Sequence, residues 1–111
     1  MKKNLLLTFI FCFTILEISA QNNLPRLSPK SFVGQTIGYT KVMINYGSPG
    51  VKERSIWGGL VPYGEVWRTG ANEATTIEFD SDVFIEGNKV AAGKYSLFTI
   101  PGEDKWTVIL N

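Results

Sequence analysis

Residues 41–46 read KVMINY, and this alternation decides the fold class. The even positions carry Val42, Ile44 and Tyr46, whereas the odd positions carry Lys, Met and Asn. Successive side chains of an extended chain point to opposite faces, so a period of two is typical of a β-strand that buries one face. The stretch therefore predicts a half-buried strand with Val42, Ile44 and Tyr46 on its buried side.

Short stretches of the same kind lie on both sides of it. No window shows apolar residues at helical spacing, and turn residues recur between the stretches. We expect a turn around Gly38 and Tyr39 and a two-residue hairpin turn at Gly87-Asn88. The sequence predicts an all-β fold, an antiparallel β-sandwich or a barrel-like domain, with further strands at 35–37, 75–79, 83–85, 89–91, 94–100 and 105–110.

The last predicted strand ends the chain. It runs into Asn111 with no turn or polar tail behind it, which would leave an apolar edge uncovered. We therefore expect the β-rich domain to be truncated at its C-terminus.

The N-terminus has the three parts of a secretory signal. Lys2 and Lys3 form a basic start, an apolar run spans 5–16, and small residues end the segment. The apolar run is too short to span a bilayer. We expect a signal peptide at 1–20, cleaved between Ala20 and Gln21. An extended lead-in at 21–31 and a single β domain at 32–111 would follow, with no membrane span in the mature form.

Loss of the signal peptide narrows the chemistry of what remains. The single cysteine, Cys12, leaves with it, and the chain has no histidine. Disulfides, thiol or imidazole catalysis and the usual zinc, copper or haem ligands are thereby excluded, and no phosphate-binding fingerprint appears. Asp80 and Asp82 could contribute to a calcium site, but Asp-Ser-Asp between strands favours turn chemistry. We expect no metal and no cofactor, and the balanced charge argues against nucleic acid.

The candidate site lies in the irregular, glycine-rich segment between the strands at 41–46 and 75–79. Aromatic faces with a few oriented polar groups suit a pocket for a sugar or another amphipathic small molecule. The alternative is structural: the aromatic side chains plug an open end of the sandwich, and Arg68 pairs with Glu65 or Glu73. The candidate ligand-binding residues are Trp57, Tyr63, Glu65, Trp67, Arg68, Asn72 and Glu73.

A wider pattern covers nearly the whole mature chain. It comprises RLSPK at 26–30, QTIG at 35–38, YGSPGVK at 46–52, IWG at 56–58, LVPYG at 60–64, VWRTGANEAT at 66–75 and AGKYSLF at 92–98. With these motifs the chain resembles the exported bacterial family known as domain of unknown function 2911. Because the family has no assigned activity, the resemblance gives no catalytic residues to carry over, and it implies further sheet beyond the position of Asn111.

These observations lead to one favoured expectation and two alternatives. We expect an exported, periplasmic or secreted, non-catalytic β domain that binds a carbohydrate or another cell-envelope ligand, with a small molecule or an envelope protein as partner. The first alternative is a structural or protein-interaction module of the envelope. The second is a hydrolase that uses Glu65 and Glu73 as its carboxylate pair. The oligomeric state is left open.

Overall fold

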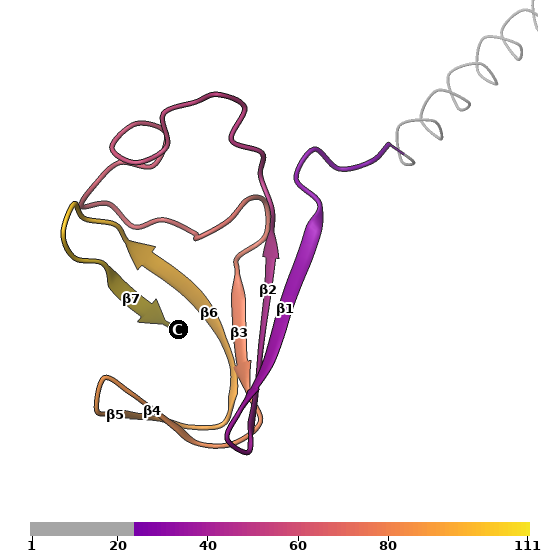
Figure 1. The fold of residues 1–111 in the computed structure, drawn as a ribbon, viewed down its shortest axis with the longest axis vertical. Coiled ribbons are helices and arrows are strands. Elements are labelled where there is room, and N and C mark those ends of the chain that lie inside the picture. The colour runs from indigo at the N-terminus through magenta and orange to yellow at the C-terminus, as the bar shows by residue number, and fades with distance from the viewer. Residues whose placement is uncertain (1–23) are drawn as a thin grey trace, which may run out of the picture.

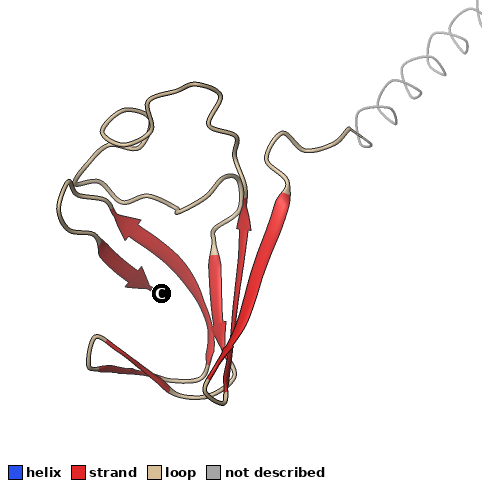
Figure 2. Cartoon of the chain, in the orientation of Figure 1, coloured by secondary structure: helices blue, strands red, loops and turns tan. Residues whose placement is uncertain are grey.

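The computed structural model describes residues 24–111, which form an all-β fold without a helix (Figure 2). The predicted signal peptide and the cleavage site at Ala20 and Gln21 lie outside the described residues. In the part that is described, no helix is long and apolar enough to cross a membrane. The seven strands are β1 (Lys30–Ile37), β2 (Thr40–Gly47), β3 (Thr76–Phe79), β4 (Val83–Ile85), β5 (Asn88–Val90), β6 (Gly93–Ile100) and β7 (Thr107–Leu110). The predicted all-β class is confirmed.

Five strands form one antiparallel sheet, and the other two form a separate hairpin. The order in the main sheet is β1-β2-β3-β6-β7, with every neighbouring pair antiparallel. Strands β4 and β5 extend from the lower end of this sheet, and the long loop between β2 and β3 crosses to the far end of β6 and returns (Figure 1). Strands β1 and β7 stand at opposite ends of the order, so the sheet is not a closed barrel.

The hairpin of β1 and β2 turns at the predicted place, but β1 is longer than expected. Ile37 pairs with Thr40 across a two-residue turn whose first residue, Gly38, has a φ of +62°. Glycine adopts this left-handed conformation without steric cost, which suits a tight hairpin. Strand β1 begins at Lys30, inside the predicted lead-in, because the register with β2 continues to Lys30 opposite Gly47.

The hairpin of β4 and β5 corrects the predicted turn by one position. Ile85 pairs with Asn88, so the two turn residues are Glu86 and Gly87, not Gly87 and Asn88. Both have positive φ, +50° and +77°, as a type I′ turn requires. The glycine takes the second turn position, and Asn88 becomes the first residue of β5, where its side-chain amide donates to the Glu86 carbonyl at 3.2 Å.

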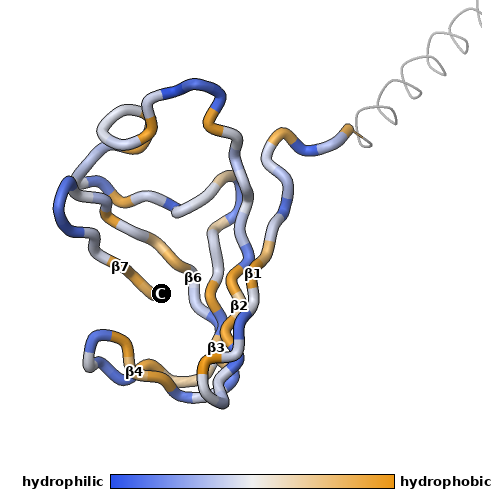
Figure 3. The backbone as a smooth tube through the Cα atoms, in the orientation of Figure 1, coloured by the Kyte–Doolittle hydropathy of each residue, from blue (hydrophilic) through white to orange (hydrophobic). Residues whose placement is uncertain are grey.

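The predicted alternation of β2 is confirmed, and the register extends it across the sheet. Val33, Ile44 and Ile77 lie in one row on the same face, and this row continues to Tyr95 of β6. In the next row Phe79 is 5% exposed, and its ring lies 6.3 Å from that of Tyr95. Figure 3 shows apolar residues along the strands and polar residues at the tips of the long loops. This apolar face is the one that carries the core.

Candidate functional site

The loop that carries the candidate residues is fastened to the end of β6 by backbone hydrogen bonds. The Trp67 amide donates to the Thr99 carbonyl at 2.7 Å, and the Thr99 amide donates back at 3.0 Å. Three residues earlier, the Gly64 amide donates to the Pro101 carbonyl at 2.8 Å. Residues 64–67 therefore continue the sheet beside β6, next to the place where β3 begins.

Threonine hydroxyls fix the same loop from inside. The hydroxyls of Thr69 and Thr99 lie 2.9 Å apart, and the Thr75 hydroxyl donates to the Thr69 carbonyl at 2.9 Å. Thr75 is 1% exposed, and Thr69 has a φ of +58°, which is unfavourable for a β-branched residue. The hydrogen bonds of Thr75 and Thr99 offset this cost, so the loop has a defined shape.

Three tryptophans meet where this loop faces the turn between β6 and β7. The ring centroids of Trp57 and Trp67 lie 5.6 Å apart, those of Trp57 and Trp106 4.9 Å, and those of Trp67 and Trp106 6.3 Å. All three pairs are edge-to-face, with interplanar angles of 70° to 79°. Trp57 is 48% exposed and Trp106 43% exposed. This aromatic cluster (Trp57, Trp67 and Trp106) is therefore packed and also open to solvent.

Tyr63 lies beside a tight turn of the same loop. Its ring contacts Gly58, whose φ is +76° and where an added Cβ would come within 2.8 Å of the tyrosine Cε2 atom. The Gly58 amide donates to the Val61 carbonyl at 3.0 Å, which closes the turn. Val61 is 6% exposed, so this small turn has its own buried residue while Tyr63 remains 41% exposed.

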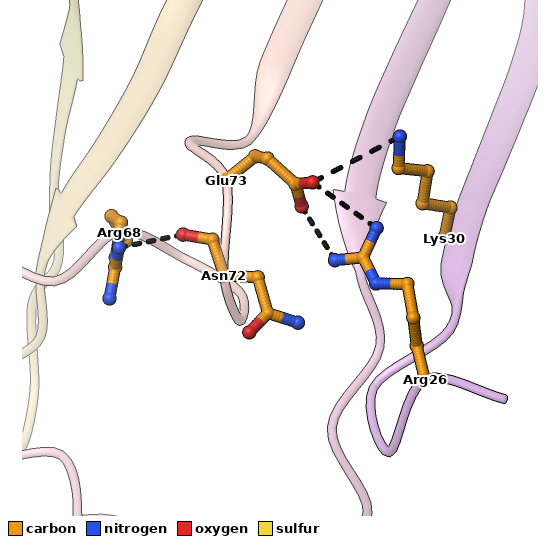
Figure 4. A network of polar contacts seen from close by, with 5 residues as sticks. All are labelled: Arg26, Lys30, Arg68, Asn72 and Glu73. Carbon is orange, nitrogen blue, oxygen red and sulfur yellow. Dashed lines mark hydrogen bonds and ion pairs between the residues drawn. The ribbon is translucent and has the colours of Figure 1, made fainter. Parts of the chain in front are cut away.

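Arg68 does not pair with a carboxylate as the structural alternative predicted. Its Nη1 atom donates to the backbone carbonyl of Asn72 at 2.6 Å, and the ion pairs of the described residues do not include it. Asn72 has a φ of +65°, and Figure 4 shows its backbone carbonyl directed at Arg68 while its side chain points away. Arg68 therefore stabilises a left-handed backbone position, which explains its place in the loop without a carboxylate partner.

Glu73 points away from Arg68 and binds the segment before β1. Arg26 donates to its two carboxylate oxygens, Nη1 to Oε1 at 3.2 Å and Nη2 to Oε2 at 2.7 Å. The Lys30 ammonium lies 3.9 Å from Oε1 (Figure 4). The hydrogen bonds from Arg26 are the main reason that the pKa of Glu73 lies below its ordinary value, and a backbone hydrogen bond and the charge of Lys30 act in the same direction. We call these three residues the outer ion-pair group.

A shallow hollow adjoins the outer ion-pair group. Its volume is about 290 Å³, and Lys30, Asn45, Glu73 and Lys94 line it. The aromatic cluster does not line this hollow.

The proposed carboxylate pair meets a chemical difficulty. Glu65 is exposed, and Glu73 is held in its ionised form by Arg26. A general acid of a glycosidase needs a raised pKa, so Glu73 is poorly suited to donate a proton.

The carboxylates of the turn before β4 bind separate partners. The Lys41 amide donates to Asp80 at 2.8 Å, and the Ala92 amide donates to Asp82 at 2.9 Å. Asp82 also forms an ion pair with Lys89 at 3.0 Å. Within residues 24–111, no group of three or more carboxylates, thiols or imidazoles is placed to hold a metal ion. Asp80 and Asp82 act as turn residues.

The structure thus places the seven predicted site residues in different parts of the loop rather than around one pocket. It joins Trp57 to Trp67, places Tyr63 beside Gly58, and separates Glu73 from Arg68. Trp106 was missed, because it follows β6 and is far along the chain from the loop. Arg26 was missed because it lies in the predicted lead-in. The chain has three tryptophans, and the shared residue type was the one signal in the sequence that could have indicated Trp106.

Comparison with known proteins gives a family but no activity. No curated protein and no solved structure shows significant similarity to the chain. The sequence profile of DUF2911, described as a protein of unknown function, matches residues 28–111. This range contains all the strands described above, and it confirms the resemblance drawn from the motifs. The chain therefore belongs to the DUF2911 family.

Proposed function

We propose that the chain is an exported, non-catalytic binding domain and that its aromatic cluster binds a carbohydrate of the cell envelope. The observation that carries the proposal is the half-exposed packing of Trp57 and Trp106 against Trp67. Rigid indole rings offer a large apolar surface at little conformational cost, and their N–H groups can bond to hydroxyls. Sugar rings present apolar C–H faces and polar rims, which match such a surface.

The rigidity of the loop supports the same proposal. Trp67 is held by two backbone hydrogen bonds to Thr99, and Trp57 is packed against it. The rings are therefore already in place before a ligand arrives, which lowers the entropy cost of binding.

Binding is tested with soluble tetrasaccharides, chitotetraose and cellotetraose, followed by tryptophan fluorescence and calorimetry on the full chain. We expect saturable binding of at least one sugar, and Trp106→Ala should weaken it at least about tenfold, which corresponds to about 1.4 kcal/mol. Phe84→Ala is the matched control, because Phe84 is a 73% exposed aromatic residue of the β4–β5 hairpin. Equal affinity of the two variants, or no binding of either sugar, would refute the carbohydrate proposal and favour the structural module.

Export is tested separately. Export is supported by the three parts of the predicted signal peptide: the basic start, the apolar run and the small residues before the cleavage site. Mass spectrometry of the protein recovered outside the cytoplasm should give Gln21 as the first residue. Recovery of the uncleaved chain in the cytoplasm would overturn this part of the proposal.

A further inference from the structure

Strand β1 is an open edge of the main sheet. It pairs with β2 on one side, and no other strand within residues 24–111 pairs with it. The Ser48 amide donates to the Pro29 carbonyl at 2.9 Å, one position before the strand. Because backbone groups alternate in direction along a strand, the odd residues of β1 bond to β2. The even residues, Lys30, Phe32, Gly34 and Thr36, direct their amides and carbonyls outward.

From Ser31 to Ile37, this edge has none of the usual protection against pairing. From Ser31 to Ile37 the strand has no charge, no proline and no bulge, and every residue pairs in unbroken register. Phe32 is 72% exposed, Val33 51% and Ile37 64%. Natural edge strands commonly place lysine, proline or a bulge at such positions. Seven consecutive unprotected residues, Ser31 to Ile37, are suited to accept another strand.

We propose that the occupant of this edge is β1 of a second copy of the chain, paired antiparallel about a two-fold axis at Val33. In this register Lys30 pairs with Thr36 of the other copy, and Phe32 pairs with its Gly34. In this register all four outward residues of β1, Lys30, Phe32, Gly34 and Thr36, form backbone hydrogen bonds with the other copy. The two sheets would then form one continuous ten-stranded sheet.

The side chains on the outer face are self-complementary in this register. Gly34 has no side chain, and the Met43 thioether lies over it, with Cε 2.9 Å and Sδ 3.3 Å from the position of an added Cβ. Beside them is a hollow of about 370 Å³ lined by residues of β1 and β2, including Phe32 of the same copy, Gly34, Lys41 and Met43. Phe32 of the second copy lies directly opposite Gly34, so its ring enters this hollow and contacts the Met43 sulfur. The symmetry repeats the contact.

The other face is complementary as well. Val33 lies in the apolar row with Ile44 and Ile77, and the two-fold axis places it against Val33 of the second copy. The row therefore continues without interruption from one copy to the other. On the outer face, which also carries Phe32, Lys30 lies opposite an uncharged threonine, and Glu73 already partners it at 3.9 Å, so no like charges are directly opposed.

A symmetric cross-link tests the register. Val33 would form a non-hydrogen-bonded pair with itself, in which the Cα atoms lie about 4.5 Å apart, within the range of a disulfide. In the full chain with Cys12→Ser, we expect mild oxidation to convert Val33→Cys into a covalent dimer. The matched control is Ile37→Cys on the same face, because its opposite position is Pro29. Equal cross-linking of the two variants would overturn the register.

Sedimentation of the full chain without an added cysteine tests the dimer itself. We expect a species of twice the 12.4 kDa chain mass at micromolar concentration. Phe32→Ala should raise the dissociation constant at least about tenfold. Thr36→Pro should abolish the dimer with unchanged circular dichroism, because it removes only an outward amide. A monomer at all concentrations, or a dimer that survives both substitutions, would refute the proposal.

Discussion

The guanidinium group of Arg26 donates hydrogen bonds to both carboxylate oxygens of Glu73, and the shorter of the two is 2.7 Å. These residues are 47 positions apart, and the contact joins the segment before β1 to the loop before β3. Paired charge-assisted hydrogen bonds fix orientation as well as distance. The outer ion-pair group therefore holds two segments that share no strand pairing.

The first prediction concerns the pH at which this contact is lost. Arg26 lowers the pKa of Glu73, so the contact contributes stability above the ordinary value of 4.5 and loses it as the pH falls through the folded pKa. NMR titration of the carboxyl group should give a midpoint below 4.5, and Arg26→Gln should raise it. Lys30→Gln is the control with a smaller rise, since its contact is 3.9 Å. An unchanged midpoint in Arg26→Gln would contradict the assigned cause.

The second prediction concerns the buried hydroxyl of Thr75. Thr75→Val keeps the shape of the side chain but leaves the Thr69 carbonyl without its donor. We expect the free energy of unfolding to fall by about 1–3 kcal/mol in urea titrations. Thr107→Val, at an exposed strand position, should change it by less than about 0.5 kcal/mol. Equal effects would show that the Thr75 hydrogen bond contributes nothing.

The third prediction concerns a close backbone approach at the end of β2. A Cβ at Gly47 would collide with the Ala71 carbonyl oxygen, and the Ala71 amide donates to the Gly47 carbonyl at 3.1 Å. Because backbone atoms cannot move aside easily, Gly47→Ala should destabilise the fold by about 1–3 kcal/mol. Gly50→Ala is the matched control, since its Cβ would meet only Lys52 side-chain atoms at 3.7 Å or more. Thermal unfolding of the two variants should separate them clearly.

The fourth prediction compares two phenylalanines. Phe79 is 5% exposed and Phe84 is 73% exposed. Truncation of a buried phenylalanine removes transfer free energy and leaves a cavity, so Phe79→Ala should cost about 3–5 kcal/mol. Phe84→Ala should cost less than about 0.5 kcal/mol in the same denaturant titration. A cost for Phe84→Ala that approaches that of Phe79→Ala would mean that the β4–β5 hairpin packs on the main sheet in solution.

The fifth prediction is a gain of stability at the β4–β5 turn. Glu86 adopts a φ of +50°, which asparagine tolerates better than glutamate in a type I′ turn. Glu86→Asn should raise the free energy of unfolding by roughly 0.5–1 kcal/mol. Glu103→Asn, a matched change of charge at a residue without positive φ, should give no such rise. A lower melting temperature for Glu86→Asn would mean that the glutamate side chain has a role of its own.

The all-β class and most strands could be predicted because a strand with one buried face has apolar residues at every second position of its sequence. On β2 the core side carries Val42, Ile44 and Tyr46, so the alternation is visible in the sequence. The start of β1 could not be predicted from the sequence, because an edge strand that is exposed at most positions shows no alternation of apolar and polar residues. The β4–β5 turn was misplaced by one residue because glycine can occupy either central position of a primed turn.

The candidate site could be predicted only in part, because its contacts join residues that are far apart in the sequence. Trp57 and Trp67 share a loop and were selected together. Trp106 and Arg26 reach that loop only through the pairing of β6 with β7 and of β1 with β2. Local composition contains no information on such distances, so Glu73 was grouped with its sequence neighbours and not with Arg26.

The aromatic cluster has a consequence for the order in which the chain can fold. A polypeptide leaves the ribosome from its N-terminus, so Trp57 and Trp67 are synthesised well before Trp106. The hairpin of β1 and β2 closes over a two-residue turn and can form early. The contacts of Trp57 and Trp67 with Trp106 cannot form until β6 and the turn behind it have emerged. Tryptophan emission of a nascent chain should therefore shift late in synthesis, and that shift would mark the completion of the cluster.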